Sequence, residues 1–183
     1  MARDEKLRYP IGREDEQQAY KSGFNNELKT SLINEIEMLP SSLEVAIQNL
    51  DASQLETPYR PDGWTVQQVV HHVADSHMNA YIRFKLGLTE EDPTIKPYDQ
   101  EAWASLSDSK KVPVNISITL LYSLHTRWNQ LMKDMVETEW QRTIYHPQRE
   151  VEMTMWNLLK SYAWHGRHHV AHILQLRERE GWN

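Results

Sequence analysis

The sequence predicts an all-α protein, a four-helix bundle with long crossover connections. Four segments place apolar residues at the three- and four-residue spacing of a helix. The 6 Gly and 8 Pro are few among 183 residues, which disfavours a fold of many short strands and tight turns. Two long, proline-containing connections separate the helical segments, as expected where a chain crosses a bundle.

The first helix is expected over residues 27–39. Its apolar positions have helical spacing and are Leu28, Leu32, Ile33, Ile36 and Leu39. Pro40 is expected to interrupt it, because proline has no N–H to donate. Proline is tolerated in a first helical turn, so a second segment is expected over residues 41–50. Residues 53–63, with Pro58, Pro61 and Gly63, are expected to form a loop.

Thr65 is expected to cap the second long helix, over about residues 66–88, and Gln68 completes a capping box. Residues 90–113 contain three prolines and form the first long crossover. Asn115 is expected to cap the third helix, which continues through residue 136. The second connection, residues 139–151, is expected to include a short extended piece. Thr154 then caps the fourth helix, which ends near Glu180 before Gly181.

The whole chain, residues 1–183, is expected to form one domain, with residues 1–24 as a polar, loosely held N-terminal arm. The net charge of -6 disfavours nucleic-acid binding, which needs a basic face. No apolar stretch approaches the length of about 20 residues that a bilayer span requires. The N-terminus lacks a signal-peptide pattern and the chain has no cysteine, so we expect a cytoplasmic protein without disulfides or thiolate ligands.

Seven of the 9 histidines lie in two clusters on the second and fourth predicted helices. Imidazole is a common ligand of Zn, Ni and Fe. Two histidines four residues apart on a helix point the same way and can chelate one ion. The fourth helix offers this spacing twice, as His165/His169 and as His168/His172.

Helical geometry favours His165 and His169 as the chelating pair. At about 100° per residue, His169 lies near the centre of the apolar stripe and His168 near its polar edge. That stripe is formed by Met155, Leu158, Tyr162, Ile173 and Leu176. On the second helix, periodicity does not select a third ligand from among His71, His72 and His77. Each histidine has an ordinary alternative role, on the surface or hydrogen-bonded in the core.

Several short motifs are specific in their combined order and spacing. They are Gly63-Trp64-Thr65-Val66, Val69-Val70-His71-His72, Asp75-Ser76-His77-Met78-Asn79, and Trp164-His165 with His168-His169 and Ala171-His172. With these motifs the chain resembles the DinB-like superfamily, and within it the YfiT or bacillithiol transferase branch. The resemblance covers nearly the whole chain. Further agreement lies in Tyr9-Pro10-Ile11-Gly12, Pro97-Tyr98-Asp99 with Trp103, and Tyr145-His146-Pro147.

The resemblance implies one divalent metal per chain, zinc or nickel, held by His72, His165 and His169. It also implies a homodimer. Met78, Ile82 and Leu86 lie on the far side of the second helix, and are expected to form a dimer contact or to pack under the N-terminal arm.

Three functions follow as expectations. The resemblance implies a thiol S-transferase that joins bacillithiol, or another low-molecular-weight thiol, to a small electrophile. The alternative enzyme is a metal-dependent hydrolase that acts on a hydrolysable substrate through metal-bound hydroxide. The alternative outside catalysis is a helical stress-response module.

Other polar residues have both a functional and an ordinary interpretation. Asp75 either orients a ligating imidazole or is exposed. His168 and His172 either lie behind the ligands or contact a charged substrate group, and surface placement of His168 is equally expected. The sequence assigns no role to His77, Tyr98, Asp99 and Trp103.

For Arg83 and Lys85 a solvated helix face is favoured over contact with an anionic thiol. Packing is favoured for Tyr162, and a hydrogen-bonded core position for His125. The tryptophans Trp64, Trp128, Trp156 and Trp164 are expected in the core.

Overall fold

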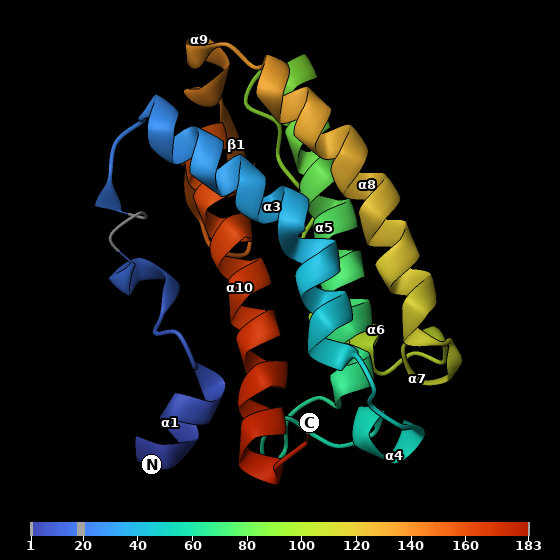
Figure 1. Cartoon of the computed structure of the whole chain (residues 1–183). Coiled ribbons are helices and arrows are strands. Elements are labelled where there is room, and N and C mark those ends of the chain that lie inside the picture. The colour runs from blue at the N-terminus through green and yellow to red at the C-terminus, as the bar shows by residue number, and fades with distance from the viewer. Residues whose placement is uncertain (1, 18–20, 183) are drawn as a thin grey trace.

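Four long helices form a bundle in the computed structural model, which describes residues 2–17 and 21–182 (Figure 1). They are α3 (Asn26–Ile47), α5 (Val66–Thr89), α8 (Val114–Asp134) and α10 (Met155–Glu180). Around the bundle, α3 packs on α8, α8 on α5, α5 on α10, and α10 on α3. The predicted all-α, four-helix fold class is confirmed. No helix among the described residues is long and apolar enough to cross a bilayer.

The direction of the helices explains the long crossover. In Figure 1, α3 and α10 run downward, whereas α5 and α8 run upward. Because α5 and α8 are parallel neighbours, the chain must return along the bundle between them. The returning segment contains two short helices, α6 (Gln100–Ala104) and α7 (Asp108–Lys111), and both pack on α5.

The connection between α8 and α10 contains α9 (Glu137–Trp140) and an antiparallel pair of strands, β1 (Thr143–His146) and β2 (Val151–Thr154). The crossover joins this hairpin, since the Ile95 N–H donates to the Tyr145 carbonyl at 3.0 Å. The structure therefore contains the short extended piece that was expected here. Between α3 and α5, the predicted loop begins with one helical turn, α4 (Ala52–Leu55), capped by Asp51.

The N-terminal arm packs on α10. Its described parts include α1 (Ala2–Arg8) and the 3-10 turn η1 (Glu14–Glu16), and both contact α10. The expectation of a loosely held arm is therefore wrong for these parts, and residues 18–20 of the predicted arm lie outside the described residues. The arm covers α10 rather than the far side of α5, where Ile82 is 55% exposed. The homodimer and the assignment of residues 1–183 to one domain remain predictions.

The helix ends test the predicted caps. The Thr65 hydroxyl accepts from the Gln68 N–H at 3.2 Å, and the Gln68 side chain accepts from the Thr65 N–H at 3.0 Å. The Thr154 hydroxyl accepts from the N–H of Asn157, and Gly181 has the left-handed conformation of a helix C-cap, with φ 69°. These caps are confirmed. Asn115 is not a cap, because α8 already begins at Val114 behind Pro113.

The predicted break at Pro40 is wrong, because α3 continues through it (Figure 1). Proline removes the N–H that would bond the carbonyl four residues earlier, which is that of Ile36. The Nδ1 of His125, on the neighbouring helix α8, lies 2.6 Å from this carbonyl oxygen. A hydrogen bond from another helix therefore replaces the one that Pro40 cannot make, and the predicted separate segment over residues 41–50 does not form.

The core consists of two apolar clusters separated by histidines. One cluster includes Phe84, Trp128 and Leu159, and the other includes Leu43 and Val69. Between them along the bundle, three helices place buried histidines instead of apolar side chains. These histidines are His77 on α5, His125 on α8, and His168, His169 and His172 on α10. We call them, together with the ligand candidates His72 and His165, the histidine layer.

Replacing Thr154 by Ala removes the cap of α10, the helix that carries four histidines of this layer. We expect the free energy of unfolding to fall by about 1 kcal/mol, measured by urea denaturation. Thr119→Ala is the control, because that exposed hydroxyl only donates to the Asn115 carbonyl within α8. Equal stability of the Thr154 variant and the wild type would contradict the role of the cap.

Candidate metal centre

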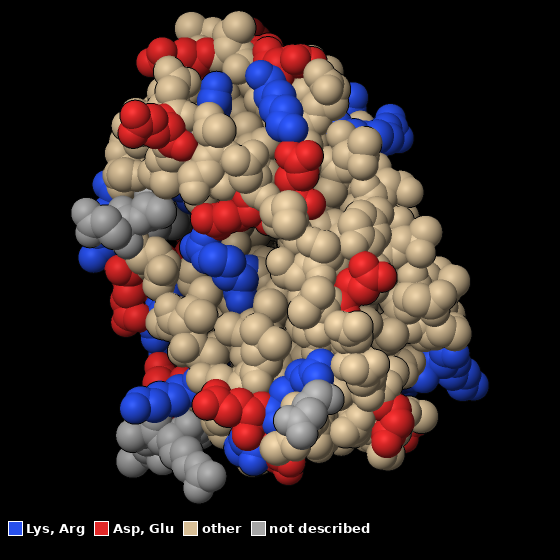
Figure 2. Space-filling view, in the orientation of Figure 1, with Lys and Arg blue, Asp and Glu red and all other residues tan. Residues whose placement is uncertain are grey.

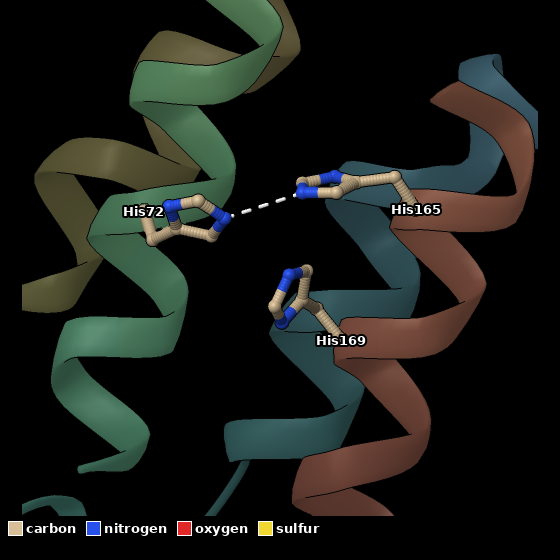
Figure 3. Close-up of side chains that lie close together, drawn as sticks. All are labelled: His72, His165 and His169. Carbon is tan, nitrogen blue, oxygen red and sulfur yellow. Dashed lines mark hydrogen bonds between the residues drawn. The ribbon is translucent and has the colours of Figure 1, made fainter. Parts of the chain in front are cut away.

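Three imidazoles from two helices of the bundle converge on one another (Figure 3). His72 comes from α5, and His165 and His169 come from successive turns of α10. Their possible ligand nitrogens all lie within 4.8 Å of one another. The Nε2 atoms of His72 and His165 are 3.2 Å apart, and the His169 ring points into the space beside them.

The donor set fits a divalent cation. The ligand nitrogens of a tetrahedral zinc site lie roughly 3.3–3.4 Å apart when each Zn–N distance is about 2.0–2.1 Å. Burial, together with the neighbouring His168 and His172, lowers the pKa of His72 to about 3. Burial also holds the pKa of His165 and His169 well below the ordinary value. All three imidazoles are therefore neutral near pH 7, the form that binds a metal.

The alternative pair on α10, His168 and His172, faces a different part of the chain. The His168 ring stacks on Trp164 with centroids 4.4 Å apart, and it lies 6.0 Å from the ring of Tyr9. The His172 ring stacks on Tyr59 at 4.0 Å. His168 is only 7% exposed, so the alternative of a surface position is wrong. Helical arithmetic placed it at the polar edge, but the N-terminal arm covers that edge.

The structure also separates the three candidates on α5. It brings His72 to the cluster, as the resemblance implies. His71 turns away, and its ring nitrogens bond the Ser117 hydroxyl at 2.7 Å and the Val112 carbonyl at 2.9 Å. The Nδ1 of His77 lies 3.1 Å from Nε2 of His125, inside the core. The expected core position of His125 is therefore confirmed.

Two cavities meet at the cluster. The first, of about 470 Å³, is lined by all three candidate ligands, and the second, of about 630 Å³, is lined by His165. Arg149 lines both cavities. Volumes of this size suit a small molecule. The cluster is therefore accessible from two sides, as in metal sites that keep positions for water or substrate.

Two half-buried tryptophans, Trp64 and Trp164, line the first cavity. The ring centroids of Trp64 and His72 are 4.5 Å apart, and the indole N–H of Trp64 donates to Glu101 at 2.8 Å. Trp64 also packs against the core cluster that includes Leu43 and Val69. The expected core position is confirmed for Trp128 and Trp156, which are buried.

Two arginines, Arg83 and Arg149, line the second cavity together with the acidic residues Asp99 and Glu101. Arg83 donates to the Tyr162 hydroxyl at 2.7 Å, and Arg149 lies in the turn between β1 and β2. Both arginines lower the pKa of His146, together with its burial, which acts most strongly. Arg83 thus faces a cavity, against expectation, whereas Lys85 is exposed. The space-filling view shows side chains of both charges scattered over a face made mostly of uncharged residues (Figure 2).

Sequence reasoning missed Arg149. It lies in a connection without helical periodicity, and its only signal was the family agreement at Tyr145-His146-Pro147 just before it. Tyr162 packs in the core with its ring 5.7 Å from that of Trp128, as expected, although its hydroxyl also accepts from Arg83.

Two residues of the crossover, Tyr98 and Asp99, line the second cavity. Burial raises the pKa of Tyr98 to about 12, so its hydroxyl is protonated near pH 7. The Asp99 carboxylate caps α6 by accepting from the Ala102 N–H at 3.0 Å. Trp103 packs on Tyr98 with centroids 4.5 Å apart. The pKa of Asp75 is raised to about 6 by burial and by the nearby charge of Asp108.

The fold and the three-histidine cluster are those of a helical bundle built around a candidate metal centre. The sequence profile of the DinB superfamily matches residues 35–173, and the chain belongs to this superfamily.

Similar proteins extend this assignment. A protein of Bacillus cereus (strain 03BB102) named "Putative metal-dependent hydrolase" is 53% identical over 176 residues, covering 96% of this chain and 98% of the relative. A protein of Bacillus thuringiensis subsp. konkukian with the same description has the same identity and coverage. The solved structure of YfiT from Bacillus subtilis matches with a TM-score of 0.92 and 46% identity, covering 97% of this chain and 99% of that one. YfiT is described as "a probable metal-dependent hydrolase with an unusual four-helix bundle topology".

The buried histidines make the stability of the metal-free protein depend on pH. Burial lowers the pKa of His125 and His172 to about 4 and that of His72 to about 3. Histidine in the unfolded chain has a pKa of about 6.5, so above this pH these histidines do not change the free energy of unfolding with pH. Below it, only the unfolded chain takes up protons, and stability falls by about 1.4 kcal/mol per pH unit for each such histidine.

Urea denaturation of the metal-free protein at pH 7.5, 6.5 and 5.5 tests this expectation. The variant His125→Gln should show a shallower loss between pH 6.5 and 5.5, because it lacks one of the titrating groups. Equal stability of the wild type at pH 7.5 and 5.5 would contradict the neutral, buried state of these imidazoles.

Proposed function

We propose that this chain is a metal-dependent enzyme that holds one zinc or nickel ion on His72, His165 and His169. We further propose that it transfers a low-molecular-weight thiol, bacillithiol in the first place, to small electrophiles, and that it does so in the cytoplasm. The observation that supports this proposal most strongly is the convergence of three neutral imidazoles between two cavities.

The residues of the chain have separable tasks in this reaction. A bound divalent cation would stabilise the anionic form of an incoming thiol, which is the nucleophilic form. Trp64 and Trp164 give the first cavity apolar and aromatic walls beside the cluster. The thiol sulfur forms a bond to an electrophilic carbon, the leaving group departs with its electron pair, and the thiol proton passes to solvent.

The second cavity supports an anionic thiol as substrate. Arg83 and Arg149 lie there beside His146, although the net charge of the chain is -6. A guanidinium pairs well with a carboxylate because its donors form a planar fork. Bacillithiol carries carboxylates. In the proposed complex, Arg83 and Arg149 bind these carboxylates while the thiol sulfur lies toward His165.

Hydrolysis is the second candidate. The names of the Bacillus relatives and the description of YfiT favour it. A divalent cation on three histidines also lowers the pKa of bound water, so the same centre supports a hydrolase. The two accessible cavities disfavour the third expectation, a non-catalytic module, because a structural site is usually closed by a fourth protein ligand.

The transferase proposal predicts metal-dependent conjugation of bacillithiol. The wild type should join bacillithiol to monochlorobimane, and a chelator should abolish this activity. His72→Ala, His165→Ala and His169→Ala should each lower the rate at least about 100-fold, because each removes a ligand. The fluorescence of the conjugate measures the rate.

His71→Ala is the matched control, since His71 precedes His72 but bonds Ser117 and Val112 instead. Its rate should stay within about threefold of the wild type. Metal binding without conjugation of any thiol would contradict the transferase and favour the hydrolase. Conjugation that survives the chelator would contradict both.

The two arginines should determine the preference for an anionic thiol. Arg83→Met and Arg149→Met should each raise KM for bacillithiol by roughly 10-fold or more, since a charged hydrogen bond contributes about 1.5–3 kcal/mol. KM for cysteamine, which has no carboxylate, should stay unchanged. Lys85→Met is the control, because Lys85 is exposed two residues from Arg83. An equal rise in KM for both thiols would contradict carboxylate recognition.

A further inference from the structure

The ring nitrogen of His169 that faces away from the cluster contacts another histidine. Nδ1 of His169 lies 3.4 Å from Nδ1 of His172, and Nε2 of His172 lies 3.1 Å from the backbone carbonyl of Arg8. His172 is only 2% exposed. These contacts run from the cluster through His172 to the N-terminal arm, and we call them the His172 chain.

The end of the His172 chain determines where its protons lie. A backbone carbonyl can only accept, so Nε2 of His172 must carry the proton and donate it to Arg8. A neutral imidazole has one N–H, which leaves Nδ1 of His172 as an acceptor. Nδ1 of His169 is then the donor of this pair. His169 keeps its lone pair on Nε2, the nitrogen that faces His72 and His165 in Figure 3.

A second set of contacts leads toward His165. The carbonyl of Ile36, which Pro40 leaves without its helical donor, must accept from Nδ1 of His125. Nε2 of His125 is therefore an acceptor, and Nδ1 of His77 donates to it across 3.1 Å. Nε2 of His77 is left with a lone pair, so the direction of these bonds is again set by a backbone carbonyl. We call this set the His77 chain.

The His172 chain ends at the candidate ligand His169, and the His77 chain ends near the other candidate ligand of α10, His165. Nε2 of His77 and Nδ1 of His165 are both buried without a hydrogen-bond partner among the described residues. Their ring centroids are 5.6 Å apart. The His77 ring, with its acceptor, thus neighbours the ring of His165, whose Nδ1 must carry a proton when its Nε2 binds a metal. The two atoms are complementary as acceptor and donor, although no hydrogen bond joins them in this structure.

We infer that the His172 chain is a positioning device that holds His169 in the tautomer with a free Nε2 lone pair, and that the His77 chain presents an acceptor on the His165 side of the cluster. Backbone carbonyls of Arg8 and Ile36 set the direction of the two chains. His172, His77 and His125 act through the ligands and do not touch the ion or a substrate. The inference rests on the proposed three-histidine metal site. It assigns a role to buried histidines that the proposed reaction itself does not use.

The tautomers can be measured without metal or substrate. Long-range ¹H–¹⁵N spectra of the metal-free wild type should show the proton on Nδ1 of His169, His77 and His125, and on Nε2 of His172. The variant His172→Phe keeps a ring against Tyr59 but cannot accept, so it should shift His169 toward the other tautomer. A wild-type His169 with its proton on Nε2 would overturn the inference.

Zinc affinity, measured by competition with a chelator, is the second readout. His172→Phe should weaken binding by about 10–100-fold, the usual effect of removing a group that orients a ligand. His172→Gln should restore most of this loss, because its amide can accept from His169 and donate to Arg8. His71→Gln is the control: it changes a buried, hydrogen-bonded histidine outside both chains and should leave the affinity unchanged.

The outcomes separate this inference from the proposed function. Unchanged zinc affinity in a folded His172→Phe variant would overturn the inference and leave the metal site intact. If the wild type binds no zinc, the proposed function fails, and the metal-free spectra still decide whether the chains set the tautomers.

Discussion

The histidine layer is the constraint on which the rest of this structure depends. An unpaired polar group in an apolar core costs roughly 1–3 kcal/mol, so every buried imidazole nitrogen needs a partner or a metal. The bundle places its histidines between two apolar clusters, where few other polar side chains are within reach. Backbone carbonyls, neighbouring imidazoles and the candidate metal position therefore share the task. The layer stabilises the fold only when these partners are present.

Two features outside the layer follow from it. The N-terminal arm lies on α10, where the Arg8 carbonyl meets His172 and Tyr9 covers His168. Pro40 stays inside α3 because the carbonyl that it leaves free binds His125. A proline that weakens one helix thus creates the acceptor that a buried histidine of another helix requires. The arm and α3 are in this way connected to the centre of the bundle.

Periodicity and capping predicted the four helices because these signals are local. The same local geometry selected His165 and His169 on α10. It failed where a partner distant in sequence decides the outcome. His125 rescues the helix at Pro40, and the arm buries His168. Arg149 reaches the cavities from a turn without periodicity. His72 could be named only from the family resemblance, because His77 lies nearer the apolar stripe of α5 than His72 does and the partners of all three histidines lie on other elements.

Anomalous diffraction from crystals grown with zinc tests whether the three histidines hold a metal ion. We expect one strong anomalous peak per chain at the zinc edge, bonded to Nε2 of His72, His165 and His169 at about 2.0–2.1 Å. The peak should be absent from crystals of His169→Ala. A peak on His168 and His172 instead, or none at the three-histidine cluster, would contradict the proposed metal site.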